Sequence, residues 1–174
     1  DDYMAEKPQG SPTTYLIYNL GDVEIKGFEA SASYGYQNFN SELSYAKSDT
    51  KNSLNGDPVA GGNGRSIDMG DSIALTFDYQ SDSLESVFGW TSIFVREEDN
   101  VKDGQPVKDS YNVHNLYAQW VPSNIDGLSV TFGIDNVFDE LYTSHASRSG
   151  TMFTTTFDDY EPGRSYKLSA AYQF

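Results

Sequence analysis

Apolar and polar residues alternate with a period of two along most of this chain, and the alternation is cleanest at the C-terminal end. Between residues 164 and 174, every second position is apolar, and the positions between them are mostly polar. Successive side chains of a β-strand point to opposite faces of a sheet, whereas a helix would scatter these positions around its surface. The pattern therefore predicts a strand with one apolar and one polar face. Its apolar positions are Tyr166, Leu168, Ala170, Tyr172 and Phe174.

The same alternation recurs upstream and predicts seven strands joined by connections of two alternating lengths. Short turns lie near Asn38, Asp82 and Asn124, whereas the long loops are rich in glycine, asparagine, aspartate, serine or proline. We therefore expect an all-β, antiparallel up-and-down meander with short turns on one side and long loops on the other. The predicted strands are 14–36, 38–48, 68–81, 84–97, 110–121, 127–138 and 163–174. The predicted long loops are 49–67, 98–109 and 139–162.

Transmembrane β-barrels have this asymmetry, with short periplasmic turns, long extracellular loops and an apolar residue facing lipid at every second position. Aromatic residues such as Tyr34, Tyr79 and Trp120 gather beside the short turns, as an interfacial girdle requires. The girdle favours an apolar face turned to lipid, although the alternation alone fits either facing. Seven strands do not close an even-numbered barrel, so we expect a piece of a larger one. A soluble or adhesin-like β-domain is the alternative.

Composition narrows the class of protein further. The 174 residues include 11 lysines and arginines against 26 aspartates and glutamates, which gives a net charge of −15 and argues against a nucleic-acid partner. An aromatic content of 14% distinguishes the chain from a disordered acidic tail. The absence of cysteine excludes disulfides and thiolate metal sites. The chain begins at Asp1 without an initiator methionine, so we expect a mature protein or a piece of one.

Three segments carry more specific signals. Residues 21–30 read GDVEIKGFEA, residues 136–142 read NVFDELY, and residues 162–164 read PGR before the closing strand. In this order, they resemble the G-x-x-x-x-x-G-x-E strand, the N-[VL]-F-D-x-x-Y segment and the final P-G-R strand of TonB-dependent outer-membrane receptors. The resemblance covers essentially all of the chain. It implies that residues 1–174 are the last seven of 22 barrel strands, with the N-terminal plug and the earlier strands upstream.

The residues of these segments are predicted to be structural. Asn136 and Asp139 flank an apolar pair where a strand leaves the membrane, and their side chains can bond backbone groups freed from the ladder. The resemblance also implies that Phe174 is recognised by the barrel-assembly machinery, and that TonB engages a region upstream of this chain. The structural candidates are Asn136, Phe138, Asp139, Gly163, Arg164 and Phe174.

The resemblance implies TonB-dependent uptake of an iron chelate across the outer membrane of a Gram-negative bacterium, with outer-membrane lipid around the barrel. The transported ligand is then heme or a ferric siderophore, and no firmly bound cofactor is expected. The segment around His145 favours a heme receptor, and a siderophore receptor of the same family is the alternative.

Three residues of the last long loop are candidate ligand contacts. A neutral imidazole at His145 can bind heme iron, Arg148 can pair with a propionate, and Tyr142 offers an aromatic face. We expect His145 to be exposed, and a merely solvated loop histidine is the default interpretation against which the ligand role is set. The other histidine, His114, is expected to be an exposed residue at the rim of a strand.

Catalytic and metal sites are not predicted. No Ser/His/Asp set and no carboxylate pair falls on one identifiable face, so the chain is not expected to be an enzyme. The loops carry acidic clusters at 97–99 and 158–161, but calcium requires several converging oxygens, and residues 55–57 (NGD) are too sparse to indicate such a site. The glycine-rich segment 61–65 lacks the Lys-Ser/Thr that a phosphate-binding loop needs.

Overall fold

The computed structural model describes residues 2–9, 14–59, 70–101, 106–147, 149–152 and 155–174, and its regular elements are all strands. Within these ranges no helix has the length and hydropathy needed to cross a membrane. The strands are β1 (Asp2–Pro8), β2 (Tyr15–Tyr36), β3 (Phe39–Asn52), β4 (Ser72–Ser81), β5 (Ser86–Val95), β6 (Tyr111–Trp120), β7 (Leu128–Asp135), β8 (Ser149–Met152), β9 (Thr155–Asp158) and β10 (Ser165–Tyr172).

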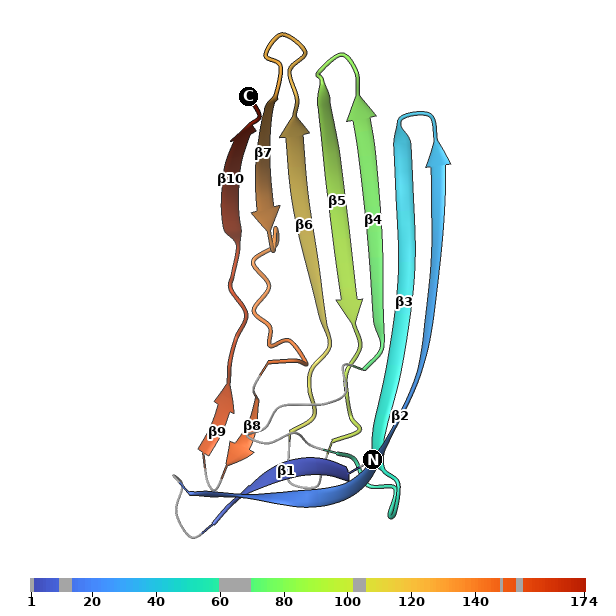
Figure 1. Cartoon of the computed structure of the whole chain (residues 1–174), viewed down its shortest axis with the longest axis vertical. Helices are drawn as coiled ribbons and strands as arrows, with labels where there is room; N and C mark the ends of the chain where they lie inside the picture. Colours follow the sequence, from blue (N-terminus) through green and yellow to red (C-terminus); the bar gives the residue numbers. More distant parts are fainter. Residues whose placement is uncertain (1, 10–13, 60–69, 102–105, 148, 153–154) are drawn as a thin grey trace.

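Eight of the strands form one antiparallel sheet in the order β1-β2-β3-β4-β5-β6-β7-β10. The seven predicted strands correspond to β2 through β7 and β10, so the all-β meander is confirmed. The short turns β2–β3, β4–β5 and β6–β7 lie at one end of the sheet together with the C-terminus (Figure 1). The long connections lie at the opposite end, as the alternating lengths predicted.

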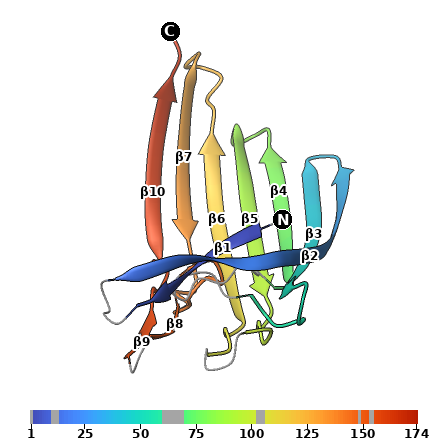
Figure 2. The ribbon, with the colours of Figure 1, turned by 60° about the horizontal axis from the view of Figure 1, so that its bottom comes forward.

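Two hairpin elements were not predicted. Strand β1 pairs with residues 15–22 of β2, and this ribbon crosses the end of the sheet that carries the long loops (Figure 2). Strands β8 and β9 pair with each other inside the segment expected to be a loop, 139–162. The pairing of each hairpin is between backbone groups, and neither hairpin has the clean alternation of apolar and polar residues that marks a strand between two environments.

The register places the apolar positions of neighbouring strands on one face. A single row of paired residues crosses seven strands, and every member is aromatic or aliphatic. The next row along the strands lies on the opposite face and is small, polar or charged apart from one tyrosine. The apolar row is Tyr36, Phe39, Tyr79, Phe88, Ala118, Phe132 and Leu168. The opposite row is Gly35, Asn40, Asp78, Gly89, Tyr117, Gly133 and Lys167.

The apolar face is uncovered. Leu168 is 76% exposed and Phe132 is 44% exposed, while the buried apolar side chains of the described residues are Val59, Val95 and Val113. A soluble sandwich would bury one face of such a sheet against a second layer. The exposed apolar face therefore favours a sheet whose partner is lipid.

On the polar face, an aromatic ring covers a glycine of the neighbouring strand. Gly89 pairs with Tyr117, and the Tyr117 ring occupies the space that a Cβ atom at Gly89 would need. The Tyr117 hydroxyl continues past β5 and donates a hydrogen bond of 2.9 Å to Asp78 Oδ1 on β4. One side chain thus joins three strands, a device that pins the register of curved sheets.

Candidate functional site

The strand that ends at Asp135 continues into a turn closed by one asparagine. Asn136 is buried and has a φ of 51°, a left-handed conformation that asparagine tolerates well. Its Oδ1 accepts a 2.8 Å hydrogen bond from the Glu140 N–H, and its Nδ2 donates a 2.9 Å bond to the Glu140 carbonyl. Its own N–H donates to Asn115 Oδ1 on β6 at 2.9 Å. The turn is therefore fixed both internally and to the sheet.

The same turn is tied to the beginning of the last strand of the sheet. Asp139 has a φ of 58°, and its Oδ1 accepts a 2.8 Å hydrogen bond from the Arg164 N–H. A Cβ atom at Gly163 would lie 2.7 Å from that oxygen, so only glycine leaves room for the contact. Asn136 Nδ2 also lies 3.4 Å from the Pro162 carbonyl oxygen. The two C-terminal segments singled out in the sequence thus form one hydrogen-bonded unit, in which the side chains of Asn136 and Asp139 bond backbone groups outside the ladder.

This unit positions Tyr142 over the start of β6. The Tyr142 carbonyl accepts a 2.9 Å hydrogen bond from the Glu161 N–H. The Tyr142 ring is half-buried and lies 4.5 Å from the Tyr111 ring, with 31° between the two ring planes. The two rings form a tyrosine pair at the loop end of the sheet.

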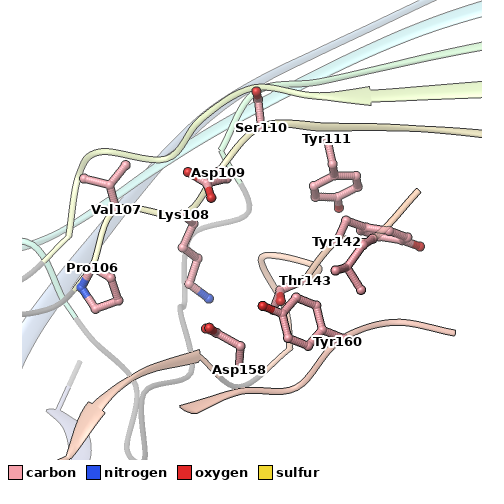
Figure 3. Close-up of a pocket in the computed structure, with 11 residues that line it drawn as sticks. Pro106, Val107, Lys108, Asp109, Ser110, Tyr111, Tyr142, Thr143, Asp158 and Tyr160 are labelled. Atoms are coloured by element: carbon pink, nitrogen blue, oxygen red, sulfur yellow. The ribbon is translucent and has the colours of Figure 1, made fainter. Parts of the chain in front are cut away.

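A cavity of about 300 Å³ lies on the loop side of the tyrosine pair (Figure 3). Residues 106–111 form one wall, and residues 141–143 with Asp158 and Tyr160 form the other. Figure 3 shows the Lys108 ammonium pointing across the cavity toward Asp158. Aromatic surfaces, hydroxyls and one cation therefore share a space in which a small planar or polar group fits.

Lys108 is the buried charge of this site. It is 9% exposed, and its Nζ donates to the carbonyls of His145 at 2.8 Å and Ser147 at 3.3 Å. Burial lowers the pKa of Lys108, and the carboxylates of Asp158 and Glu98 oppose that shift. An ammonium group has three N–H donors, and the third faces the cavity, where the Asp158 carboxylate lies opposite it. Burial also raises the pKa of Tyr142, which keeps its hydroxyl protonated at neutral pH.

His145 is buried, so the expectation that it is exposed was wrong. Its exposure is 0%, its ring packs edge-on against Tyr111 at 5.6 Å, and its Nε2 lies 3.1 Å from the Asp109 carbonyl oxygen. The cause is that the loop after β7 folds back onto the connection between β5 and β6. Its role as an axial heme ligand stays a prediction, and ligation through Nε2 would require the ring to leave Asp109. Arg148, the predicted propionate partner, lies outside the described residues.

His114 is half-buried rather than exposed at the rim, because aromatic side chains surround it on the apolar face. Its ring lies 5.8 Å from Trp90, 5.7 Å from Phe94 and 5.0 Å from Phe138. Its Nδ1 lies 2.8 Å from Ser92 Oγ. Phe138 is thereby placed on the apolar face, away from the loop cavity.

A second cavity, of about 520 Å³, lies against the polar face of the sheet just below the tyrosine pair. Tyr111 and Tyr142 line it from the loop side, and Asn115, Asp135 and Lys167 line it from the strands. Asp135 and Lys167 form an ion pair on this face. The tyrosine pair therefore separates the loop cavity from the polar face, on which any lumenal passage would lie.

The structure brings some predicted residues together and leaves others apart. Tyr142 lines both cavities, and His145 packs against Tyr111, the ring partner of Tyr142, whereas Phe174 is exposed at the short-turn end. No cluster of three metal-ligating side chains occurs among the described residues. Lys108 and Tyr111 were missed from the sequence, because a lone lysine in a polar loop and a tyrosine at a strand end carry no distinguishing pattern.

A family comparison covers most of the chain. Residues 1–137 match the model of the family described as "TonB dependent receptor-like, beta-barrel". The TonB-dependent heme receptor A of Haemophilus ducreyi is 27% identical over 169 residues, covering 90% of this chain and 21% of the relative. The heme transporter BhuA of Brucella ovis is 25% identical over 177 residues, covering 99% of this chain and 25% of the relative. The chain thus spans about a quarter of the length of these relatives.

Solved structures share the fold. The copper transporter OprC matches with a TM-score of 0.81 and 19% identity over 99% of this chain and 28% of its own. The apo form of the FrpB iron transporter from Neisseria meningitidis matches with a TM-score of 0.73 and 21% identity over 99% of this chain and 27% of its own. The sheet described above therefore has the architecture of part of these large barrels.

Proposed function

Since the chain belongs to the TonB-dependent receptor β-barrel family, we propose that it forms the C-terminal part of the barrel wall of an outer-membrane receptor that imports an iron chelate. In this proposal, residues 1–174 follow an N-terminal plug and earlier barrel strands, and TonB acts on that upstream region. The relatives are receptors and transporters by name, so the proposal assigns no catalytic residue to the chain.

The observation that carries the membrane assignment is the unbroken apolar row across seven strands, from Tyr36 to Leu168. It supports a wall whose apolar face meets the lipid of a Gram-negative outer membrane and whose polar face lines the lumen. The exposed Phe174 at the short-turn end is then available to the barrel-assembly machinery in the periplasm.

Heme is the favoured ligand. Two curated relatives, from Haemophilus ducreyi and Brucella ovis, are a heme receptor and a heme transporter by name. The loop cavity offers the rings of Tyr111 and Tyr142 to a flat ligand, and a ligand carboxylate could reach the ammonium group of Lys108 in competition with Asp158. A cavity of about 300 Å³ lies at the lower end of the range for ligand sites, so it suits the edge of a heme with one propionate.

A ferric siderophore is the second candidate. The same tyrosine rings and the same ammonium group suit a catecholate, which is also flat and anionic. The acidic composition of the chain, with a net charge of −15, opposes both anionic ligands at long range, so the local cation at Lys108 matters equally for either one.

Growth on defined iron sources tests the function. The complete receptor that carries this segment is expressed in a strain without other iron receptors, with the empty vector as the control. We expect TonB-dependent growth on heme, together with a Soret band when the purified receptor is titrated with heme. Growth on a ferric siderophore without a Soret band would assign the receptor to the siderophore branch. Failure to grow on any iron chelate would contradict the proposal.

A further inference from the structure

Two carboxylates face the buried ammonium group of Lys108 from different surroundings. Glu98 lies on the connection between β5 and β6 and is only 6% exposed. Asp158 ends β9 on the opposite wall of the loop cavity, and its side chain is exposed (Figure 3). Burial lowers the pKa of Lys108, and the charges of Asp158 and Glu98 oppose that shift. The ammonium group is thus stabilised by one carboxylate that is shielded from water and by one that is not.

Glu98 is fixed beside Lys108. Its Oε1 accepts a 2.8 Å hydrogen bond from the Asn100 N–H. Its Oε2 lies against Gly70, where an added Cβ atom would come within 2.9 Å of that oxygen. The backbone groups of Glu98 and Lys108 also exchange hydrogen bonds of 2.9 Å and 3.1 Å. Two residues paired in this way extend their side chains to the same face of the ladder, so the position of Glu98 does not depend on what the cavity contains.

Asp158 is held less firmly. Its backbone pairs with Ser149 of β8, so the hairpin does not depend on its side chain. Its carboxylate points toward Lys108 from a position that water reaches, and water screens the attraction between exposed charges (Figure 3). Because a carboxylate that turns away from Lys108 returns to water, little free energy opposes its displacement.

Exchange of Asp158 for an acid group of a ligand conserves the charge around Lys108. The ammonium group keeps Glu98 on its buried side and meets one further anion on the cavity side, both before and after the exchange. A ligand without an acid group would displace Asp158 and put no charge in its place, which removes one of the two carboxylates that stabilise the ammonium form. The site therefore favours an anionic ligand over a neutral ligand of the same shape.

We propose that Asp158 occupies the position that an acid group of the ligand takes when it enters the loop cavity, and that Glu98 is the positioning residue that holds Lys108 in place for either anion. This inference rests on the proposed function, because it requires the imported ligand to enter this cavity. Asp158 itself supplies a carboxylate, so the ligand class is an iron chelate with a free carboxylate, such as a heme with its propionates.

Heme binding by the complete receptor tests the displacement. Wild type and variants in detergent at a mildly acidic pH are titrated with hemin and with hemin dimethyl ester, in which the acid groups are blocked. Asp158→Asn removes the competing anion, so it should bind hemin about threefold more tightly, the effect of one exposed ion pair, and the dimethyl ester no more tightly. Asp159→Asn removes the same charge from the next residue and should show no gain. In a Lys108→Met background, Asp158→Asn should have no effect, because no ammonium group remains to compete for.

The role of Glu98 is tested without any ligand. Acetic anhydride reacts with a lysine only in its uncharged form, so the pH dependence of Lys108 acetylation, followed by peptide mass spectrometry, reports the charge of Lys108. Glu98→Gln removes a carboxylate that stabilises the ammonium form, so it should move the acetylation midpoint to lower pH by about one unit. Glu97→Gln removes an exposed carboxylate from the preceding residue and should leave the midpoint in place. Both variants retain the other titratable side chains around the cavity, which are Asp109, Tyr111, Tyr142, His145, Asp158 and Tyr160.

Each contrary result overturns a stated part. Unchanged hemin affinity in Asp158→Asn, or an equal gain with the dimethyl ester or in Asp159→Asn, would show that Asp158 does not occupy the position of the acid group. An unshifted acetylation midpoint in Glu98→Gln would remove Glu98 as the positioning residue. Absence of hemin binding by the wild type would contradict the heme assignment of the proposed function and the displacement with it, whereas acetylation would still decide the role of Glu98. Heat-dependent electrophoretic migration verifies that each variant is a folded barrel.

Discussion

The carboxylate of Asp139 accepts a hydrogen bond of 2.8 Å from the backbone N–H of Arg164, 25 residues further along the chain. This bond closes the long connection between β7 and β10 at its base, beside the close approach of Gly163. The segment in between, which carries Tyr142 and His145, is therefore held against the sheet at both of its ends.

Replacing Asp139 should loosen the two ends of the connection between β7 and β10, which its bond to Arg164 holds together. Asp139→Ala removes the acceptor and places an alanine at a φ of 58°, so we expect a loss of about 1–2 kcal/mol in unfolding free energy. Faster hydrogen exchange at the Arg164 amide would accompany it, measured by mass spectrometry on the complete receptor. Asp126→Ala, in an exposed short turn, is the matched control. An unchanged Arg164 exchange rate would show that the bond does not hold the connection.

The sheet was predictable from the sequence because each strand separates two environments. In β10, the alternation of Tyr166 and Leu168 with Lys167 is a local signal that needs no knowledge of the partner strand. Strand β1 could not be found in this way, because its ladder with β2 gives no period-two pattern. The β8–β9 hairpin escaped prediction for the same reason.

The site was only partly predictable. Asn136 and Asp139 were singled out as local backbone ligands, but their bonds to residues 162–164 depend on how the long connection folds back. The burial of Lys108 and His145 arises where two loops pack together, and neither loop encodes it alone. Contacts between segments far apart in sequence leave no trace in periodicity.

Opposite faces should respond differently to a buried charge. Leu75 and Thr76 are neighbours on β4, and the register places Leu75 on the apolar face and Thr76 on the polar face. Leu75→Arg, if near the bilayer midplane, should cost roughly 2–4 kcal/mol, whereas Thr76→Arg should be tolerated. Unfolding of the complete receptor in lipid vesicles measures both. Equal costs would defeat the assignment of the apolar face to lipid.

The ring that covers Gly89 predicts a coupled pair of substitutions. Gly89→Ala must displace the Tyr117 ring and break its 2.9 Å bond to Asp78, at a cost of about 1–3 kcal/mol. In the Tyr117→Ala background, the added methyl group meets no ring, so Gly89→Ala should then cost much less. A double-mutant cycle from unfolding measurements gives the coupling. Additive costs would mean that the position of the Tyr117 ring does not depend on the absence of a side chain at Gly89.

The two ends of the sheet should label differently on intact cells. The chain contains no cysteine, so Asn55→Cys and Asn124→Cys each introduce one thiol into this segment. Asn55 lies among the long loops and Asn124 in a short turn at the other end. An impermeant maleimide should therefore label the first and not the second. Comparable labelling at both sites would show that the proposed orientation is wrong.

His145 decides between an axial ligand and a structural support. Its burial, with Nε2 at the Asp109 carbonyl and its own carbonyl on Lys108, favours the second role. We therefore expect His145→Ala to lower heme affinity severalfold through loss of the Lys108 position, while the Soret maximum of bound heme stays unchanged. Limited proteolysis should cut residues 139–162 faster in the variant, because removing a fully buried ring leaves a cavity in the loop layer.

The two roles separate in a second variant and a rescue experiment. Lys108→Met removes the cation but not the imidazole, so it should reproduce the affinity loss and leave the Soret maximum unchanged. Because it also removes the bonds to the His145 and Ser147 carbonyls, faster proteolysis is expected in this variant too, and the rescue experiment separates the two roles. If His145 were the axial ligand, His145→Ala would shift the Soret band, and free imidazole would restore it, because only ligation depends on a nitrogen donor to iron. A Soret shift rescued by imidazole would therefore require that the loop opens, that the ring leaves Asp109, and that the buried conformation is the unliganded one.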